Sequence, residues 1–171
     1  MQITIRQELE KDFDKVESLI KEAFLNAEHT DNNEHILVKN LRKSDAFIPQ
    51  LSLVAIVNDN IVGHILFTKI KINNTTQLAL APLAVLPKYQ KMGIGKKLIE
   101  IGHKIAREMG YDFSVVLGHN NYYPKFGYKE AKIFGIKAPF EVSSENFMAI
   151  KLNDNNVNVS GIVEYAKEFF E

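Results

Sequence analysis

An unbroken apolar run at residues 78–86 constrains the fold more than any other feature of this sequence. Because no polar residues alternate with the apolar ones, the run predicts a strand buried on both faces, at the centre of a sheet. Pro82 lies inside the run and has no N–H with which to pair. The sequence therefore predicts a layered domain whose central strand has its pairing to one neighbour interrupted near Pro82.

A strong helical pattern follows shortly after this run. Apolar residues recur at helical spacing between residues 95 and 109, and Gly110 stands where a helix C-terminus is expected. The residues expected to share the buried face are Leu98, Ile101, Gly102, Ile105 and Met109. The pattern predicts that a loop with two glycines connects a central strand directly to a helix.

Other apolar patterns predict the remaining elements. Strands are expected at residues 3–6, 53–57, 61–72, 113–117 and 147–152, and helices at residues 12–24 and 37–41. Turn-prone residues 58–60 between two β-branched runs predict a hairpin, whereas residues 161–165 fit a strand or a short helix. Because strands interleave with helices and no linker or repeat intervenes, we expect one α/β (α+β layered) domain over residues 1–171.

The composition excludes several kinds of chemistry. The chain has no cysteine, which excludes disulfides, thiolate metal sites and a cysteine nucleophile. Its five histidines lack metal-ligand spacing, so no metal is expected. The charges of the 21 basic and 21 acidic residues cancel, which leaves a net charge of zero. No stretch approaches the about 18 apolar residues of a membrane span, and residues 1–6 lack the layout of a signal peptide. We expect a cytoplasmic protein without a nucleic-acid or membrane partner; a homodimer is compatible with the sequence.

The loop between the central strand and the helix has the features of a phosphate site. Gly93 and Gly95 allow a tight turn in which consecutive N–H groups face one point. The first helical turn adds unpaired N–H donors and the positive end of the helix dipole, and Lys96 and Lys97 add charge. The plainer alternative is a tight strand–helix turn followed by a solvated helix end.

Two familiar phosphate-binding motifs do not fit this loop. A Walker loop needs glycine at Gln90 and serine or threonine at Lys97, and a dinucleotide fingerprint needs a third glycine at Leu98. The pattern present is Gln-x-x-Gly-x-Gly, preceded by Leu-Ala-Val-x-Pro. A second block, residues 117–128, places Tyr123 four residues before Gly127.

Together the two blocks resemble the GCN5-related N-acetyltransferase (GNAT) superfamily, in particular a bacterial branch of N-acetyltransferases of unassigned substrate. The resemblance covers most of the chain. The second block resembles the Tyr-x-x-x-Gly-Phe segment of the family, with Tyr128 in place of the phenylalanine. It implies a mixed, mostly antiparallel central sheet flanked by helices, with two central strands splayed apart. It also implies direct transfer of an acetyl group from acetyl-CoA to a primary amine.

The resemblance further implies where the cofactor lies. The backbone of residues 83–85 is expected to meet the acetyl group and the pantetheine arm, and residues 90–96 the pyrophosphate. By name, these cofactor-binding residues are Leu83, Ala84, Val85, Gln90, Lys91, Met92, Gly93, Ile94, Gly95 and Lys96.

Acetyl transfer to an amine makes three chemical demands. The amine, with a lysine-like pKa of about 10.4, must become neutral. The charge that develops on the carbonyl oxygen needs fixed donors, and a thiolate of pKa about 8.5 leaves more easily when protonated. The resemblance makes Tyr123 the proton donor, with Tyr122 packing beneath the corner. His119 is the first candidate for the general base, and His64, Glu34 or an ordered water chain are the alternatives.

Two other functions compete with the enzyme. One is a non-catalytic acetyl-CoA-binding regulatory module on the same fold. The other is a phosphate-binding protein for a free nucleotide. The sequence does not specify the acceptor. The acidic residues within 28–34 and 139–141 either attract a cationic amine or belong to solvated loops.

Overall fold

The computed structural model describes residues 1–27, 30–155 and 158–171. Within them, strands pair in the order β1-β2-β3-β4-β5-β8-β6, with β9 against β3 and β7 against β9. The strands are β1 (Thr4–Gln7), β2 (Phe47–Val57), β3 (Asn60–Ile72), β4 (Thr75–Val85), β5 (Phe113–Leu117), β6 (Lys129–Glu130), β7 (Ile136–Lys137), β8 (Phe147–Lys151) and β9 (Gly161–Glu164). The α-helices are α1 (Phe13–Phe24), α2 (Glu34–Leu41) and α3 (Ile94–Glu108).

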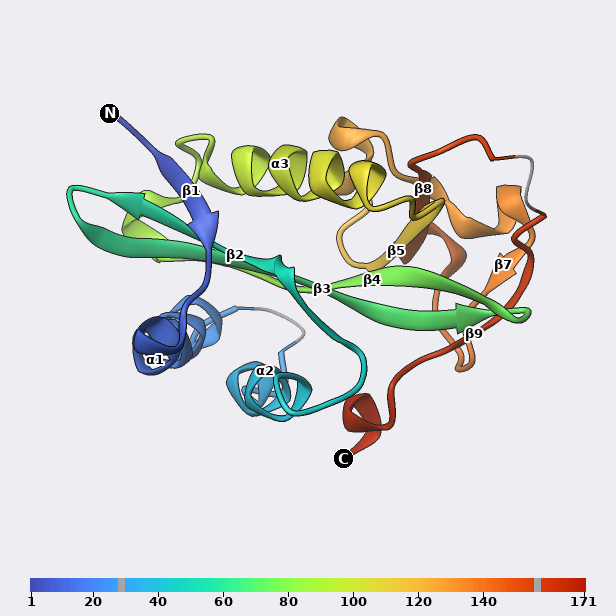
Figure 1. Ribbon diagram of the computed structural model, residues 1–171, viewed down its shortest axis with the longest axis horizontal. Helices are drawn as coiled ribbons and strands as arrows, with labels where there is room; N and C mark the ends of the chain where they lie inside the picture. Colours follow the sequence, from blue (N-terminus) through green and yellow to red (C-terminus); the bar gives the residue numbers. More distant parts are fainter. Residues whose placement is uncertain (28–29, 156–157) are drawn as a thin grey trace.

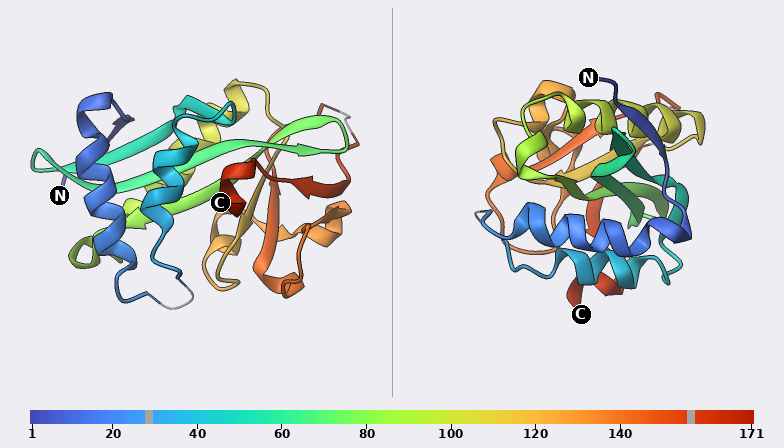
Figure 2. Two further views of the ribbon diagram at one scale, coloured as in Figure 1. Left: turned by 90° about the horizontal axis from the view of Figure 1, so that it is seen from below. Right: turned by 90° about the vertical axis from the view of Figure 1, so that its left-hand side faces the viewer.

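Helices cover both faces of the sheet (Figure 1). Helix α3 lies on one face, whereas α1 and α2 lie side by side on the other, as the view from below also shows (Figure 2). Only the β4–β5 and β7–β9 pairs are parallel among the described strands. The predicted fold class, a mixed and mostly antiparallel sheet flanked by helices, is confirmed.

The central strand has the predicted interruption. Strand β4 pairs with β3 along nearly its whole length, with a register shift between Ile65 and Phe67. On its other side it pairs with β5 only at Leu78↔Ser114 and Ala79↔Val115. Past this point the two strands separate, and Pro82 lies in the separated part. Residues 80–85 of β4 therefore have a backbone edge that β5 does not pair with.

The predicted hairpin is also confirmed. Asn58 and Asp59 both have positive φ angles, 49° and 66°, as a tight turn between twisted strands requires. Of residues 161–165, for which a strand and a short helix were alternatives, Gly161–Glu164 form strand β9; a 3-10 helix, Lys167–Phe170, follows it close to α2. Among the described residues, none of the helices has the length and apolar character that crossing a membrane requires.

The buried face of α3 differs from the predicted one. Its buried residues are Ile94, Leu98, Ile99, Gly102, His103 and Ala106. Met109, expected on that face, is 42% exposed. His103, which was not expected on this face, is buried: its Nε2 lies 3.0 Å from the Tyr128 hydroxyl, which also contacts Ser114 Oγ at 2.9 Å. Leu98 and Gly102 are buried as predicted, and Ile101 and Ile105 pack against the core while partly exposed.

Candidate active site

The loop that enters α3 has the geometry of an anion cradle. Lys91 and Gly93 have φ angles of 63° and 85°, a left-handed conformation that turns the chain sharply. The helix ladder begins with the Lys97 N–H, which donates to the Gly93 carbonyl at 3.1 Å. The N–H groups of Ile94 and Gly95 precede it in the first turn, where a helix supplies no acceptor. The loop therefore fits a phosphate group.

The charged side chains around this loop differ in their freedom. Lys97 Nζ donates to the Ile3 carbonyl at 3.2 Å, which ties this residue to the start of the chain. Lys96 is exposed and only loosely paired, 3.9 Å from Glu100. Lys91 is also exposed. Lys96 and Lys91 are thus better placed than Lys97 to neutralise a bound phosphate.

The loop is tied directly to the open edge of β4. The side-chain amide of Gln90 donates to the Val85 carbonyl at 3.1 Å. Leu83, Ala84 and Val85 pair with β3 on one side and face the separation from β5 on the other. The two groups of residues predicted to bind the cofactor are therefore contiguous in space.

The tyrosine pair folds against the same region. A β-carbon added at Gly95 would lie 2.5 Å from the Tyr122 hydroxyl oxygen and 3.7 Å from a Leu83 methyl carbon. One added at Gly118 would overlap the Tyr123 ring. The two tyrosine rings cross at 87° with centroids 5.1 Å apart, so their hydroxyls have different surroundings.

The expected roles of this pair need one correction. Tyr122, predicted to pack beneath the corner, carries its hydroxyl to Gly95 at the cofactor loop. Tyr123 packs its ring on Gly118 and edge-on to Tyr128, at a centroid distance of 5.7 Å. Burial raises the pKa of the Tyr123 phenol, and Tyr122 raises it further. A phenol with a raised pKa stays protonated at neutral pH, and the same shift makes it a weaker acid.

The predicted general base, His119, has an exposed side chain. Its backbone carbonyl accepts hydrogen bonds from the N–H groups of Tyr122 and Tyr123, at 3.2 and 3.4 Å. His119 therefore shapes the tyrosine turn through its backbone. Its role as a base stays a prediction.

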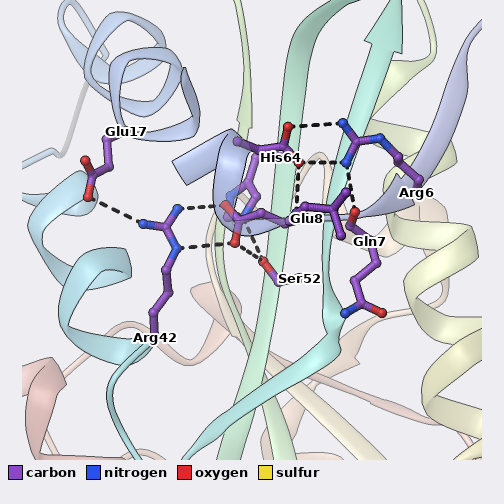
Figure 3. A network of polar contacts seen from close by, with 9 residues as sticks. Arg6, Gln7, Glu8, Glu17, Arg42, Ser52 and His64 are labelled. Carbon is purple, nitrogen blue, oxygen red and sulfur yellow. Dashed lines mark hydrogen bonds and ion pairs between the residues drawn. The ribbon is translucent and has the colours of Figure 1, made fainter. Parts of the chain in front are cut away.

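His64, an alternative base, belongs to a buried polar network on the α1–α2 side of the sheet (Figure 3). Its Nε2 lies 3.2 Å from Ser52 Oγ and 3.9 Å from Glu8 Oε2. Burial, with a smaller contribution from the Arg42 guanidinium, lowers the pKa of His64 to about 3. A fully buried imidazole with so low a pKa is a poor proton acceptor, so the position of His64 favours a structural role.

A cavity of about 590 Å³ opens where β4 and β5 part. Its sheet side is formed by residues 79–81 of β4 and 115–117 of β5. The remaining lining residues come from α2 with the turn before it, from Phe140 and from the C-terminal segment: Asp31, Asn33, Glu34, Ile36, Leu37, Asn40, Tyr165, Glu168, Phe169, Phe170 and Glu171. This volume is in the range of small-molecule sites.

Sequence reasoning found part of this cavity. Glu34 and Phe140 lie in the segments proposed to select the acceptor, and both line the cavity; Glu28 and His29, also in those segments, lie outside the described residues. The C-terminal side chains were missed. The only local signal for them is the aromatic-rich sequence at residues 165–170. Within the described ranges, no cluster of three or more histidine, aspartate or glutamate side chains could hold a metal ion.

Strands that separate at the centre of the sheet, an N–H cradle at a helix start and a cavity beside the separated strands match the fold and site that the resemblance to acetyl-CoA-dependent transferases implied. A family model described as "Acetyltransferase (GNAT) domain" matches residues 49–130. The chain belongs to the GNAT superfamily.

Two Escherichia coli proteins are similar in sequence. The uncharacterized N-acetyltransferase YjhQ of strain K12 is 39% identical over 120 residues, which are 67% of this chain and 66% of YjhQ. The uncharacterized N-acetyltransferase YhbS of the same strain is 29% identical over 169 residues, 96% of this chain and 97% of YhbS.

Two solved structures share the whole fold. The E. coli YhbS structure in complex with CoA has a TM-score of 0.90 and 26% identity, over 100% of this chain and 93% of that one. A GNAT-family acetyltransferase from Brucella melitensis in complex with acetyl-CoA has a TM-score of 0.81 and 28% identity, with 98% of each chain covered.

Proposed function

We propose that this chain transfers the acetyl group of acetyl-CoA directly to a primary amine held in the cavity between β4 and β5. The observation that carries the proposal is the open backbone edge of residues 80–85, which joins the N–H cradle of α3 to that cavity. A pantetheine arm is an extended chain with amide groups, and an unpaired strand edge offers the matching donors and acceptors. The cytoplasm stays the predicted compartment.

Each group of residues then has a task. The cradle at residues 93–96 binds the pyrophosphate, and the backbone of Leu83, Ala84 and Val85 holds the pantetheine arm. Acetyl-CoA supplies the acetyl group as an activated thioester. N–H groups on the β4 edge stabilise the charge that develops on the carbonyl oxygen. Tyr123 donates a proton to the departing sulfur.

The acceptor amine must lose a proton during the reaction. Glu34 lines the cavity and accepts a hydrogen bond from Thr30 Oγ1 at 2.5 Å, whereas the exposed side chain of His119 is not among the residues that line it. This position supports Glu34 over His119 as the base. The cavity also supports an enzyme over a non-catalytic binding module, because a regulator that binds only acetyl-CoA has no use for an acceptor space.

A turnover screen tests the function. Thiol release from acetyl-CoA is measured with peptide amino termini, lysines, polyamines and small aminated metabolites, and at least one amine should be acetylated. Intact-mass analysis after incubation with acetyl-CoA alone should show no acetyl adduct that later transfers to amine, since the chain has no cysteine. Tight binding of acetyl-CoA with no turnover on any amine would instead indicate the regulatory module.

Substituting Gly93 by alanine should weaken CoA binding by tenfold or more. Gly93 has φ 85°, and a side chain there favours a different backbone conformation, which misdirects the N–H groups of the cradle. Gly110→Ala is the matched control: Gly110 ends the same helix with φ 89°, and an added β-carbon meets nothing within 4 Å at either glycine. Both variants should lose similar stability, about 1–2 kcal/mol, and calorimetry should show weakened CoA binding only for Gly93→Ala. If the two variants bind CoA with equal affinity, the pyrophosphate does not bind at this loop.

A further inference from the structure

One wall of the cavity is a cluster of aromatic side chains from two distant segments. The Tyr165 ring is stacked on Phe140 with centroids 6.0 Å apart and an interplanar angle of 18°. The ring centroids of Phe169 and Phe170 lie 5.1 and 6.3 Å from that of Tyr165. All four rings line the cavity. Aromatic faces attract cations, and more strongly when water is partly excluded.

The charged residues of the cavity all have the same sign. Asp31, Glu34, Glu168 and Glu171 line it, and no lysine, arginine or histidine lines it among the residues that the structure describes. Glu168 is half-buried and follows the aromatic Tyr165 on the C-terminal segment. The carboxylates and the aromatic wall are independent features, and both favour a positively charged ligand.

A positive charge on the reacting amine alone does not account for this lining. That amine must be neutral to attack the thioester, and one carboxylate, Glu34, is enough to accept its proton. Further carboxylates beside it would raise the pKa of the amine and so keep it protonated. A carboxylate set apart from the reacting centre can instead hold a second ammonium group that stays charged throughout. Glu168 is suited to that task, because it lies on the same segment as three rings of the aromatic wall and is half-buried, whereas Asp31 and Glu171 are exposed.

We propose that the acceptor is a small diamine or polyamine, in which one amine is acetylated while a second, protonated amine is held by Glu168 and the aromatic wall. This inference rests on the proposed acetyl transfer. The nitrogen of the neutral amine forms a bond to the acetyl carbon as the carbon–sulfur bond breaks. That nitrogen loses a proton, and the departing sulfur gains one. The second amine keeps its charge and takes no part in the chemistry.

Binding and turnover are measured with diaminoalkanes from 1,3-diaminopropane to 1,8-diaminooctane, each matched to the 1-aminoalkane of the same length. Calorimetry on the CoA-saturated protein should show at least one diamine bound about tenfold or more tighter than its monoamine, the factor expected for one charge-assisted hydrogen bond. Thiol release should show the same preference in kcat/KM. Glu168→Gln should weaken diamine binding more than monoamine binding and so abolish the preference. Glu164→Gln, an exposed glutamate earlier on the same segment, should change neither.

The outcomes separate this inference from the function on which it rests. If no amine releases thiol but the diamine preference appears in calorimetry, the acetyl-transfer proposal fails and the cation site stands. If amines are acetylated but monoamines match diamines in both assays, or Glu168→Gln leaves the preference intact, the diamine proposal is overturned. Preferential acetylation of a peptide amine over every diamine would also overturn it.

Discussion

Tyr123→Phe is expected to lower the turnover number by roughly 10²–10⁴-fold, the range for a positioned general acid. The substitution keeps the ring that packs on Gly118 and Tyr128 and removes only the hydroxyl. Because burial raises the pKa of this phenol, it carries its proton across the whole neutral range. Affinity for acetyl-CoA should change little, since the loss concerns the reacting step.

Tyr122→Phe is the matched comparison for that experiment. Its hydroxyl lies at Gly95 on the cofactor loop, so its loss should alter the KM for acetyl-CoA more than the turnover number. Steady-state kinetics over a range of pH measures both variants. A turnover number of Tyr123→Phe within a few-fold of wild type would show that Tyr123 is not the general acid. A large loss of turnover in Tyr122→Phe alone would transfer the role of the acid to Tyr122.

Arg42→Met is expected to destabilise the fold by about 3–5 kcal/mol, the cost of leaving a buried charge without its partner. Arg42 donates to both carboxylate oxygens of Glu8, at 2.7 and 3.2 Å, and the side chains are only 6% and 1% exposed (Figure 3). Its guanidinium also lies 4.0 Å from the centre of the Phe13 ring. Such a loss is a large fraction of the about 5–15 kcal/mol that stabilises a typical domain.

Denaturant unfolding of three variants tests the cause of this loss. Lys151→Met removes an exposed partner of Asp154 and should have little effect, because surface pairs contribute little. The double variant Arg42→Met with Glu8→Leu should recover most of the stability, since no unpaired charge then remains in the core. A double variant as unstable as Arg42→Met alone would show that packing, and not charge, is what Arg42 provides.

The sequence by itself determined the central strand, the glycine loop and helix α3. Each of these features depends on residues that are neighbours in the sequence. The strand shows as an unbroken apolar run, the loop as two glycines before the helix, and α3 as a 3.6-residue apolar period. The expected interruption near Pro82 follows from a missing N–H, which is equally local. A phosphate cradle made of consecutive backbone groups can be predicted for the same reason. Strands β6 and β7 escaped prediction because two residues are too few to show a period.

Only the tertiary structure decided which residues share a site. The cavity joins α2, β4, β5 and the C-terminal segment, whose positions in the chain are far apart, so no local pattern connects Glu34 with Glu168. Burial likewise changed the meaning of single residues. His64, one candidate base in the sequence, is fully enclosed with Ser52 and Glu8, and the loss of hydration makes its charged form unfavourable. Tyr122 and Tyr123 are adjacent in sequence, but their side chains point in different directions, because consecutive side chains of a tight turn diverge. Packing against Gly95 for Tyr122 and against Gly118 for Tyr123 determines where each side chain lies.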